Sequence, residues 1–475
     1  MRFFLTHVKQ FALAIALATT LSLASCNNAA TSTTSTAPAV EPFASVEWSK
    51  DATIYEVNLR QYTPEGTLAA FQRHLPRLQQ LGVKILWFMP ISPIGKVDKK
   101  GTLGSYYSIS DYCAINPEFG TMEDFKLMVM EAHSLGMKVI IDWVANHTSR
   151  DHEWVKAHPD WYVAGKDGKP IGPYDWTDVA QLNYAGKDMQ KEMIKSMAFW
   201  LTEADIDGFR CDVAGLARDY VTEEQTVSFW EDARKALDTV KPVFMLAEDE
   251  ALRKLLYSAF DANYAWEFHH MMNHVAQGKA SVKDIQKYFE REVLNTQTRS
   301  CRMMFTSNHD ENSWNGTEFM RMGDAAKAMA ALSFTVPGFP LIYSGQEVGF
   351  KRSLEFFEKD AICWNDADNF SKLYQNLTAL KANHSALHNG AAGADMVWVN
   401  NNREKKVLMF VREDDNSKIF CVFNLSNKVL KDVEPQGDAY YGKYNLACKG
   451  ISVEFSSRPS FILNPWEYRI YATKK

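Results

Sequence analysis

The feature that most restricts the fold of this chain is a repeated unit of a helical segment, a turn and a short apolar run. In its clearest copy, residues 121–124 (TMED) have the pattern of a helix capping box, apolar residues continue at helical spacing to Leu135, and Gly136 ends the helix. The run 138–143 (KVIIDW) follows at once. A continuous apolar run of this length is typical of a strand covered on both faces, as in a parallel sheet.

The same unit occurs on both sides of that copy. Upstream, a helical segment that contains Pro76 and ends at Gly82 leads into a strand expected over 83–89, and the proline predicts that the helix kinks or restarts there. Downstream, a helix over 193–201 leads into a strand over 207–213. Further strands are expected at 53–59, 243–247, 260–266, 302–306 and 340–343.

Eight strands alternating with helices predict a (β/α)8 barrel, over residues 45–146 and 186–388, with a doubly wound open sheet as the alternative. Two regions break the alternation. Residues 147–185 are rich in Gly, Pro, Asp and Trp and hold no helix of normal length, so we expect a short excursion after the third strand. Strand-like runs at 407–411, 419–424 and 468–472 predict an antiparallel β-sandwich domain over residues 389–475.

The first residues are expected to lie outside the fold. Arg2 and Lys9 precede an apolar run over 11–18, which is too short to span a membrane and predicts an export signal over residues 1–25. Residues 23–26 (LASC) resemble the bacterial lipobox, which implies lipidation of Cys26; a plain secretory signal with an incidental cysteine is the alternative. Residues 26–44 are rich in Ser, Thr and Ala and predict a flexible tether.

Charge and cysteine content limit the kinds of molecule that this protein is expected to bind. A formal charge of −6, without a basic block, argues against nucleic acid. No acidic stretch follows Cys26, which favours the periplasmic side of the cell envelope over the cell surface, with the lipid anchor as the only membrane contact.

No cysteines form a CxxC pair, so a zinc site is not expected, and a disulfide between Cys421 and Cys448 is left open.

Polar residues gather where four of the expected strands end. In a barrel these ends share one rim, where active sites form, and so many charges are costly to bury for structure alone. The residues are Asp142, Asn146, His147, Arg210, Asp212, Glu248, Asn308, His309 and Asp310.

Glycoside cleavage requires such a set. One carboxylic acid protonates the leaving oxygen, and a carboxylate attacks or stabilises the anomeric carbon. Burial and nearby like charges raise the pKa of the acid, and an arginine beside the attacking carboxylate keeps it ionised. Histidine donors hold the sugar hydroxyls in place.

These residues are similar to the signatures of the α-amylase family of retaining glycoside hydrolases, family 13. Segments 142–147, 208–214, 244–248 and 305–310 resemble four of its signatures in order, and 104–112 and 338–347 resemble two further ones, so the resemblance covers about residues 48–475. It implies that Asp212 is the nucleophile, Glu248 the acid/base and Asp310 the stabiliser of the transition state. It also implies that the excursion is the family's domain B and the C-terminal sheet its domain C.

The same comparison implies substrate-binding roles for Tyr107, Asp142, His147, Arg210 and His309. Tyr107 would stack under the sugar at the cleavage point, and Asp142 would support Arg210. The two histidines and Arg210 would stabilise the oxocarbenium-like state.

Some positions depart from the family's pattern. Gly215 and Leu216 stand where many members have a Lys-His pair, and Gln181 stands where an Asp is usual. By resemblance, these positions contribute to leaving-group binding and to a calcium site, of which Asn146 is retained. The loss of its neighbours argues against the calcium ion, and no cofactor is expected to be required.

The sequence therefore predicts a retaining hydrolase of α-glucosidic bonds, with α-1,4 linkages expected. The short domain B favours maltodextrin or cyclodextrin over long starch chains. Two alternatives stay open: a transglycosylase or isomerase with the same residues, and a non-catalytic glycan-binding lipoprotein on an inactive barrel.

Overall fold

The computed structural model describes residues 43, 45–295, 301–447 and 449–475. The predicted export signal, the lipidation site Cys26 and Cys448 lie outside the described residues. Within the described part of the chain, no helix combines the length and the apolar character needed to cross a membrane.

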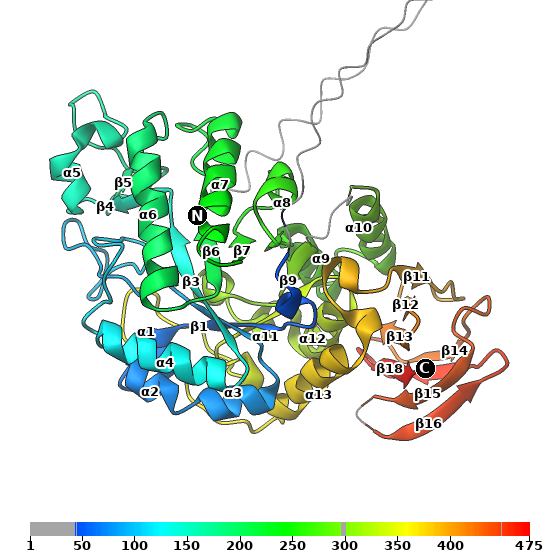
Figure 1. The fold of residues 1–475 in the computed structure, drawn as a ribbon. Coiled ribbons are helices and arrows are strands. Elements are labelled where there is room, and N and C mark those ends of the chain that lie inside the picture. The colour runs from blue at the N-terminus through cyan, green and yellow to red at the C-terminus, as the bar shows by residue number, and fades with distance from the viewer. Residues whose placement is uncertain (1–42, 44, 296–300, 448) are drawn as a thin grey trace, which may run out of the picture. The chain divides into compact units, whose positions relative to one another are not determined.

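Eight parallel strands close into a barrel in the order β1-β2-β3-β6-β7-β8-β9-β10 (Figure 1). All eight lie within one or two residues of the predicted runs, which confirms the barrel and excludes the open sheet. The strands are β1 (Ile54–Val57), β2 (Ile85–Phe88), β3 (Lys138–Val144), β6 (Gly208–Asp212), β7 (Phe244–Ala247), β8 (Ala262–Tyr264), β9 (Cys301–Met304) and β10 (Phe339–Tyr343).

Helices surround the barrel, and the predicted start and stop signals act where expected. Thr121 accepts a hydrogen bond from the backbone of Asp124, whose carboxylate accepts one from the backbone of Thr121, so the capping box is complete. A new helix begins just before Pro76, as predicted. The helices are α1 (Leu59–Tyr62), α2 (Leu68–Gln72), α3 (Leu75–Leu81), α4 (Met122–Ser134), α6 (Lys187–Glu203), α7 (Glu223–Asp238), α8 (Lys254–Ser258), α9 (Trp266–Ala276), α10 (Val282–Asn295), α11 (Glu318–Met322), α12 (Ala326–Thr335) and α13 (Phe370–Asn383).

The inward-facing residues of the strands change character along the barrel axis. Alternate strand residues point into the barrel, and those at its N-terminal end form an apolar cluster that includes Ile54, Ile140 and Phe244. Two residues further along the first two of these strands stand Glu56 and Asp142, both buried. The barrel interior is therefore filled by apolar side chains at the N-terminal ends of the strands and by polar side chains at their C-terminal ends.

The excursion between β3 and α6 is small. It contains the two-stranded antiparallel sheet β4 (His147–Ser149) and β5 (Val179–Gln181), the single-turn helix α5 (Glu153–Ala157) and the 3-10 turn η2 (Pro159–Trp161). His147 pairs with Gln181 across this sheet, directly beside the barrel rim. The excursion is therefore attached where the third strand delivers its polar residues.

The C-terminal region is an antiparallel β domain, as predicted. A six-stranded sheet in the order β11-β12-β13-β18-β15-β16 is accompanied by the two-stranded sheet β14-β17. The buried Arg412 donates a hydrogen bond to the carbonyl of Thr335 in α12, 3.2 Å away, and so ties the sheet to the barrel. The strands are β11 (Met396–Trp398), β12 (Val407–Glu413), β13 (Ser417–Asn424), β14 (Leu430–Val433), β15 (Gly442–Leu446), β16 (Ile451–Phe455), β17 (Phe461–Leu463) and β18 (Tyr468–Lys474).

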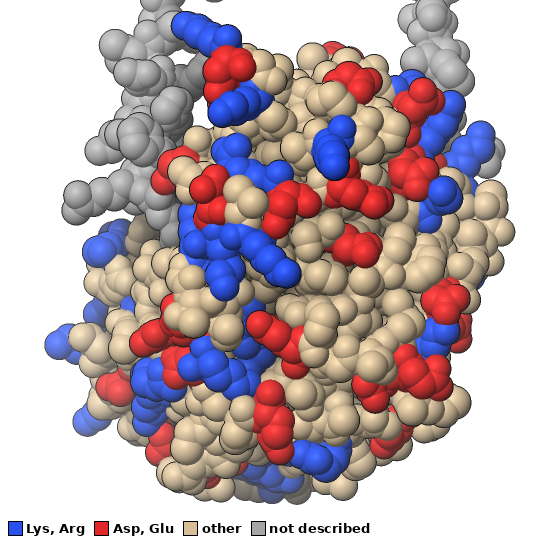
Figure 2. All heavy atoms as spheres, turned by 90° about the vertical axis from the view of Figure 1, so that its left-hand side faces the viewer, with Lys and Arg blue, Asp and Glu red and all other residues tan. Residues whose placement is uncertain are grey.

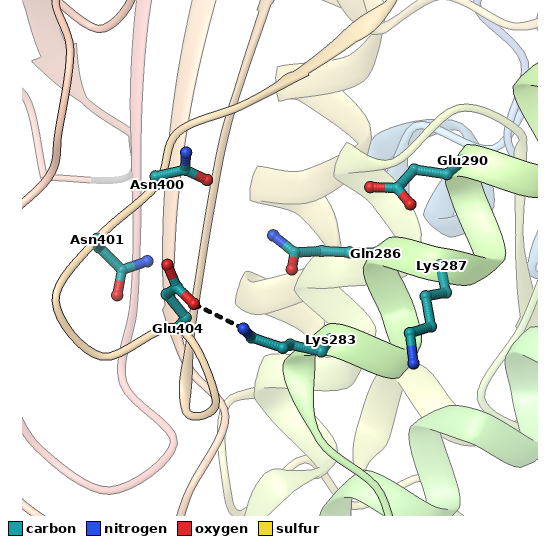
Figure 3. A pocket seen from close by; sticks show the side chains of 7 residues that line it. All are labelled: Lys283, Gln286, Lys287, Glu290, Asn400, Asn401 and Glu404. Carbon is teal, nitrogen blue, oxygen red and sulfur yellow. Dashed lines mark ion pairs between the residues drawn. The ribbon is translucent and has the colours of Figure 1, made fainter.

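The surface is mixed in charge where it can be seen. Figure 2 shows the side on which α4 and α5 lie in Figure 1, and positive and negative side chains alternate there without a broad field of one sign. A polar hollow lies between α10 and the loop before β12, where Lys283 forms an ion pair with Glu404 at 2.7 Å (Figure 3). None of the predicted site residues lines this hollow.

Candidate active site

Arg210 is the centre of the polar end of the barrel. Its guanidinium is fully buried and reaches carboxylates from three strand ends: Asp142 at 2.9 Å, Asp212 at 3.1 Å and Glu248 at 3.1 Å. Its Nε also donates to the hydroxyl of Tyr264, 3.1 Å away. Because Arg210 stands two residues before Asp212 on β6, both side chains point into the barrel. One cation therefore compensates a set of acids that would otherwise be buried without a partner.

The three predicted catalytic acids meet at this rim with different exposure. The side chains of Asp212 and Glu248 are 10% and 16% exposed, and that of Asp310 is 35% exposed. Glu248 also accepts a hydrogen bond of 2.9 Å from the backbone of Val213, which has the strained φ of 42° for a β-branched residue. The backbone after Asp212 is therefore bent so that its N–H group faces the Glu248 carboxylate.

The acids influence one another electrostatically. Burial raises the pKa of Asp212 well above its usual range, and the neighbouring Glu248 carboxylate raises it further against the opposing effect of Arg210. Burial also raises the pKa of Asp310, although His309 opposes the shift. Burial and the Glu248 carboxylate therefore outweigh Arg210 at Asp212, so the arginine alone does not keep this carboxyl group ionised as expected, and Asp212 and Asp310 retain their protons to higher pH than separate carboxyl groups would.

The two histidines of the site have opposite charge preferences. Burial disfavours the imidazolium of His309, but the carboxylates of Asp310 and Glu56 prevail and raise its pKa to about 9. Its Nδ1 lies 2.5 Å from Glu56 Oε1. Burial lowers the pKa of His147 to about 4, and its Nε2 contacts the carbonyl of Tyr107 at 3.2 Å. At neutral pH, His309 is charged and His147 is neutral.

Tyr107 lies among these residues as an aromatic floor. Its hydroxyl contacts Asp142 Oδ2 at 3.1 Å and His309 Nε2 at 2.8 Å. Its ring stacks on that of His309 with the centroids 5.4 Å apart. All eight residues predicted for catalysis or substrate binding are thus brought together at one end of the barrel.

Sequence reasoning missed three residues of the site. Glu56 holds His309, the indole of Trp87 donates to Asp142 at 3.2 Å, and the hydroxyl of Tyr264 contacts Arg210. Each is the inward-facing residue nearest the rim on its strand. Stepping by two from the apolar residues Ile54, Ile85 and Ala262 along those strands finds all three.

The oxygens around Asn146, where the resemblance implies a calcium site, lie against the side-chain amide of Gln181. The side-chain Nε2 of Gln181, with two N–H groups to donate, lies within hydrogen-bond distance of three oxygens: Asn146 O at 2.9 Å, Asn146 Oδ1 at 3.3 Å and Leu182 O at 3.0 Å. Asn146 Oδ1 also accepts from the backbone of Ala217 at 2.8 Å. In this structure an amide donor therefore faces the oxygens that a calcium ion would use, while the side-chain Oε1 of Gln181 is buried without a hydrogen-bond partner.

Comparisons with known proteins agree with this geometry. The model of the alpha amylase catalytic domain matches residues 28–424, and that of the alpha amylase C-terminal all-beta domain matches residues 398–460. The chain therefore belongs to the α-amylase family and is an α-amylase-family glycosidase.

Individual relatives are similar over most of this chain. The maltogenic alpha-amylase AmyB of Thermotoga neapolitana has a TM-score of 0.80 and 28% identity, covering 90% of this chain and 99% of that one. An alpha-amylase of Lactobacillus plantarum has a TM-score of 0.78, 28% identity and the same coverage of both chains. Alpha-amylase MalA of Haloarcula japonica is 25% identical over 434 residues, which cover 86% of this chain but only 60% of that enzyme.

Proposed function

We propose that this protein is a retaining hydrolase of α-1,4 bonds in maltooligosaccharides or related α-glucans. The observation that supports it best is the convergence of Asp212, Glu248 and Asp142 on the buried Arg210, with Asp310 at the same rim. An ion pair that only stabilises the fold balances each buried acid with one basic side chain. Here the acids outnumber the cations, and three of them keep part of their side chain exposed.

In the proposed reaction, an oxygen of Asp212 forms a bond to the anomeric carbon while the glycosidic C–O bond breaks. Glu248 gives its proton to the leaving oxygen. It then takes a proton from a water molecule, whose oxygen bonds to the anomeric carbon as the bond between that carbon and Asp212 breaks. Asp310 and the charged His309 hold the hydroxyls of the sugar whose ring flattens in the transition state. Tyr107 packs beneath that ring.

Two features support oligosaccharides as substrates. The excursion after β3 is short, so it adds few residues beside the barrel rim that carries the acids. One of the proteins of similar structure is a maltogenic alpha-amylase.

The catalytic assignment is tested with Glu248→Gln. This change keeps the size of the side chain but removes its acid, so we expect hydrolysis of maltotriose to fall by about 10²–10⁴-fold. Near-normal turnover would remove Glu248 from its proposed role. An α-configured first product, detected by NMR, would support retention, whereas a β-configured one would contradict it.

Product analysis also separates hydrolysis from transfer. A panel of maltose, maltotriose, cyclodextrin, pullulan, isomaltose and starch should give shortened products with α-1,4 substrates. Longer or rearranged glucans would indicate a transglycosylase or isomerase instead. Binding without any cleavage would indicate a glycan-binding protein.

We also propose that Cys26 is lipidated and anchors the enzyme at the cell envelope, on the periplasmic side. The LASC segment at residues 23–26 and the Ser, Thr and Ala-rich residues after it support this. Cys26→Ala should release the protein from membranes into the soluble fraction. Continued membrane attachment of that variant would contradict the anchor.

A further inference from the structure

A row of aromatic side chains leads away from the proposed cleavage point. The rings of Tyr107 and Phe356 are nearly parallel, 13° apart, with their centroids 6.3 Å from each other. Trp314 lies next to Phe356 at 5.4 Å and is tilted by 38°. Trp314 is 42% exposed, although large apolar side chains gain free energy from burial. Trp314 therefore presents part of its indole to solvent at the end of a row of rings that starts at Tyr107.

The turn that carries Trp314 is fixed to the catalytic strand end. Trp314 belongs to the π-helical turn η3 (Glu311–Asn315), which begins directly after Asp310. Glu311 is buried and forms ion pairs with His269 at 3.1 Å and Arg321 at 3.3 Å. Asn315 donates to Glu311 at 3.0 Å and closes the turn. Turns of this kind are frequent at functional sites.

The same turn also holds the loop that supplies Phe356. Asn312 is buried, and its Oδ1 accepts a hydrogen bond of 2.8 Å from the backbone of Leu354. On the other side, the ring of Tyr106 packs edge-on against Phe356 at 5.3 Å. Phe356 therefore backs Trp314 with a fixed surface, so a ligand that stacks on the indole would meet a preorganised platform.

We propose that Trp314, supported by Phe356, binds a glucose ring of the α-glucan chain outside the cleavage point. This inference rests on the proposed function and adds a position that recognises chain length. One face of a pyranose ring consists of C–H groups, which pack on flat aromatic surfaces. Since two ring-to-ring contacts separate Trp314 from Tyr107, a substrate reaches both rings only if it extends beyond the sugar at the cleavage point.

The test compares Trp314→Ala with the enzyme and with Trp314→Phe. We expect Trp314→Ala to raise KM for maltoheptaose about 3- to 10-fold, the range that loss of one aromatic contact gives, and to raise KM for maltotriose by less. Trp314→Phe keeps a ring and should retain most of the affinity. Tyr441→Ala is the matched control, because Tyr441 is 37% exposed in the C-terminal domain, and it should change neither value.

Calorimetric binding separates this inference from the proposed function. In a Glu248→Gln background without turnover, maltoheptaose should bind more weakly when Trp314 is replaced by Ala. That result would support the platform even if the enzyme proved to be a transferase or a binding protein. Equal binding with and without the indole, or equal loss for maltotriose and maltoheptaose, would overturn it.

Discussion

The charge on His309 should make the stability of the fold depend on alkaline pH. The imidazole is 2% exposed and lies between the carboxylates of Glu56 and Asp310. Its pKa of about 9 in the folded protein is above the ordinary value of 6.5. The folded state therefore binds this proton more tightly than the unfolded state does. The resulting stabilisation is complete below pH 6.5 and is lost as the pH rises through 9.

The size of this effect follows from the two pKa values of His309. At pH 7, a shift from 6.5 to about 9 contributes about 2.5 kcal/mol to the free energy of unfolding, and at pH 10 it contributes almost nothing. Replacing His309 by Asn also leaves Glu56 buried without its partner, and burial raises the pKa of that carboxyl, so its cost would change with pH. Every His309→Asn protein compared below therefore also carries Glu56→Gln, which removes this second titrating group. For cooperative unfolding of a unit of this size, about 2.5 kcal/mol corresponds to about 3 °C in Tm.

The assay is thermal unfolding of the protein and of His309→Asn at pH 7 and pH 10. The difference in Tm between the two proteins should shrink by about 3 °C at the higher pH. His147→Asn is the control, because burial lowers the pKa of His147 to about 4 and its stability effect is confined to pH values below 6.5. A gap for His309→Asn that is equal at pH 7 and pH 10 would refute the charged state.

Two further predictions concern single residues of the fold. A Cβ at Gly208, where φ is 154°, would lie 1.9 Å from the carbonyl oxygen of Phe244, so Gly208→Ala should destabilise the barrel by about 3 kcal/mol or more. In the same unfolding assay Gly186→Ala meets nothing within 4 Å and replaces only the N-cap residue of α6, so it should cost less than about 1 kcal/mol. Equal Tm values for the two variants would contradict the close approach of β6 and β7. Gln181→Asp should make the stability of the protein depend on calcium, because a carboxylate would then face the oxygens of Asn146 and Leu182. The Tm of this variant should fall in chelator and recover with millimolar Ca²⁺. The Tm of the unmodified enzyme should change in neither condition. A fall in the Tm of the unmodified enzyme in chelator would show that Gln181 turns its oxygen towards a bound ion.

The barrel could be predicted because its signals are local. Each strand is a short apolar run, and helices beside the strands begin or end at recognisable residues such as Thr121 or Pro76. The acids could be predicted because the ends of parallel strands share one rim, so their positions in the chain convert directly into a place in the fold.

The parts that escaped prediction depend on pairings across the barrel. Glu56 is 253 residues from His309 in the chain, and no local pattern links them. The amide of Gln181 reaches Asn146 only because β4 and β5 pair, and Trp314 meets Phe356 through a turn and a loop whose conformations depend on buried polar contacts. The two-residue period of the strands would still have indicated Glu56, because it places an acid in the row of Ile54.

The two-residue spacing of Arg210 and Asp212 has a consequence for how the protein can change. Both side chains are fixed by the pleat of one central strand, so their separation does not depend on any loop. Trp314 and the excursion after β3, in contrast, are carried by connections that can lengthen, shorten or be replaced without moving that strand. New substrate preferences can therefore arise when rim segments are exchanged, because such exchanges leave the spacing of Arg210 and Asp212 on β6 unchanged.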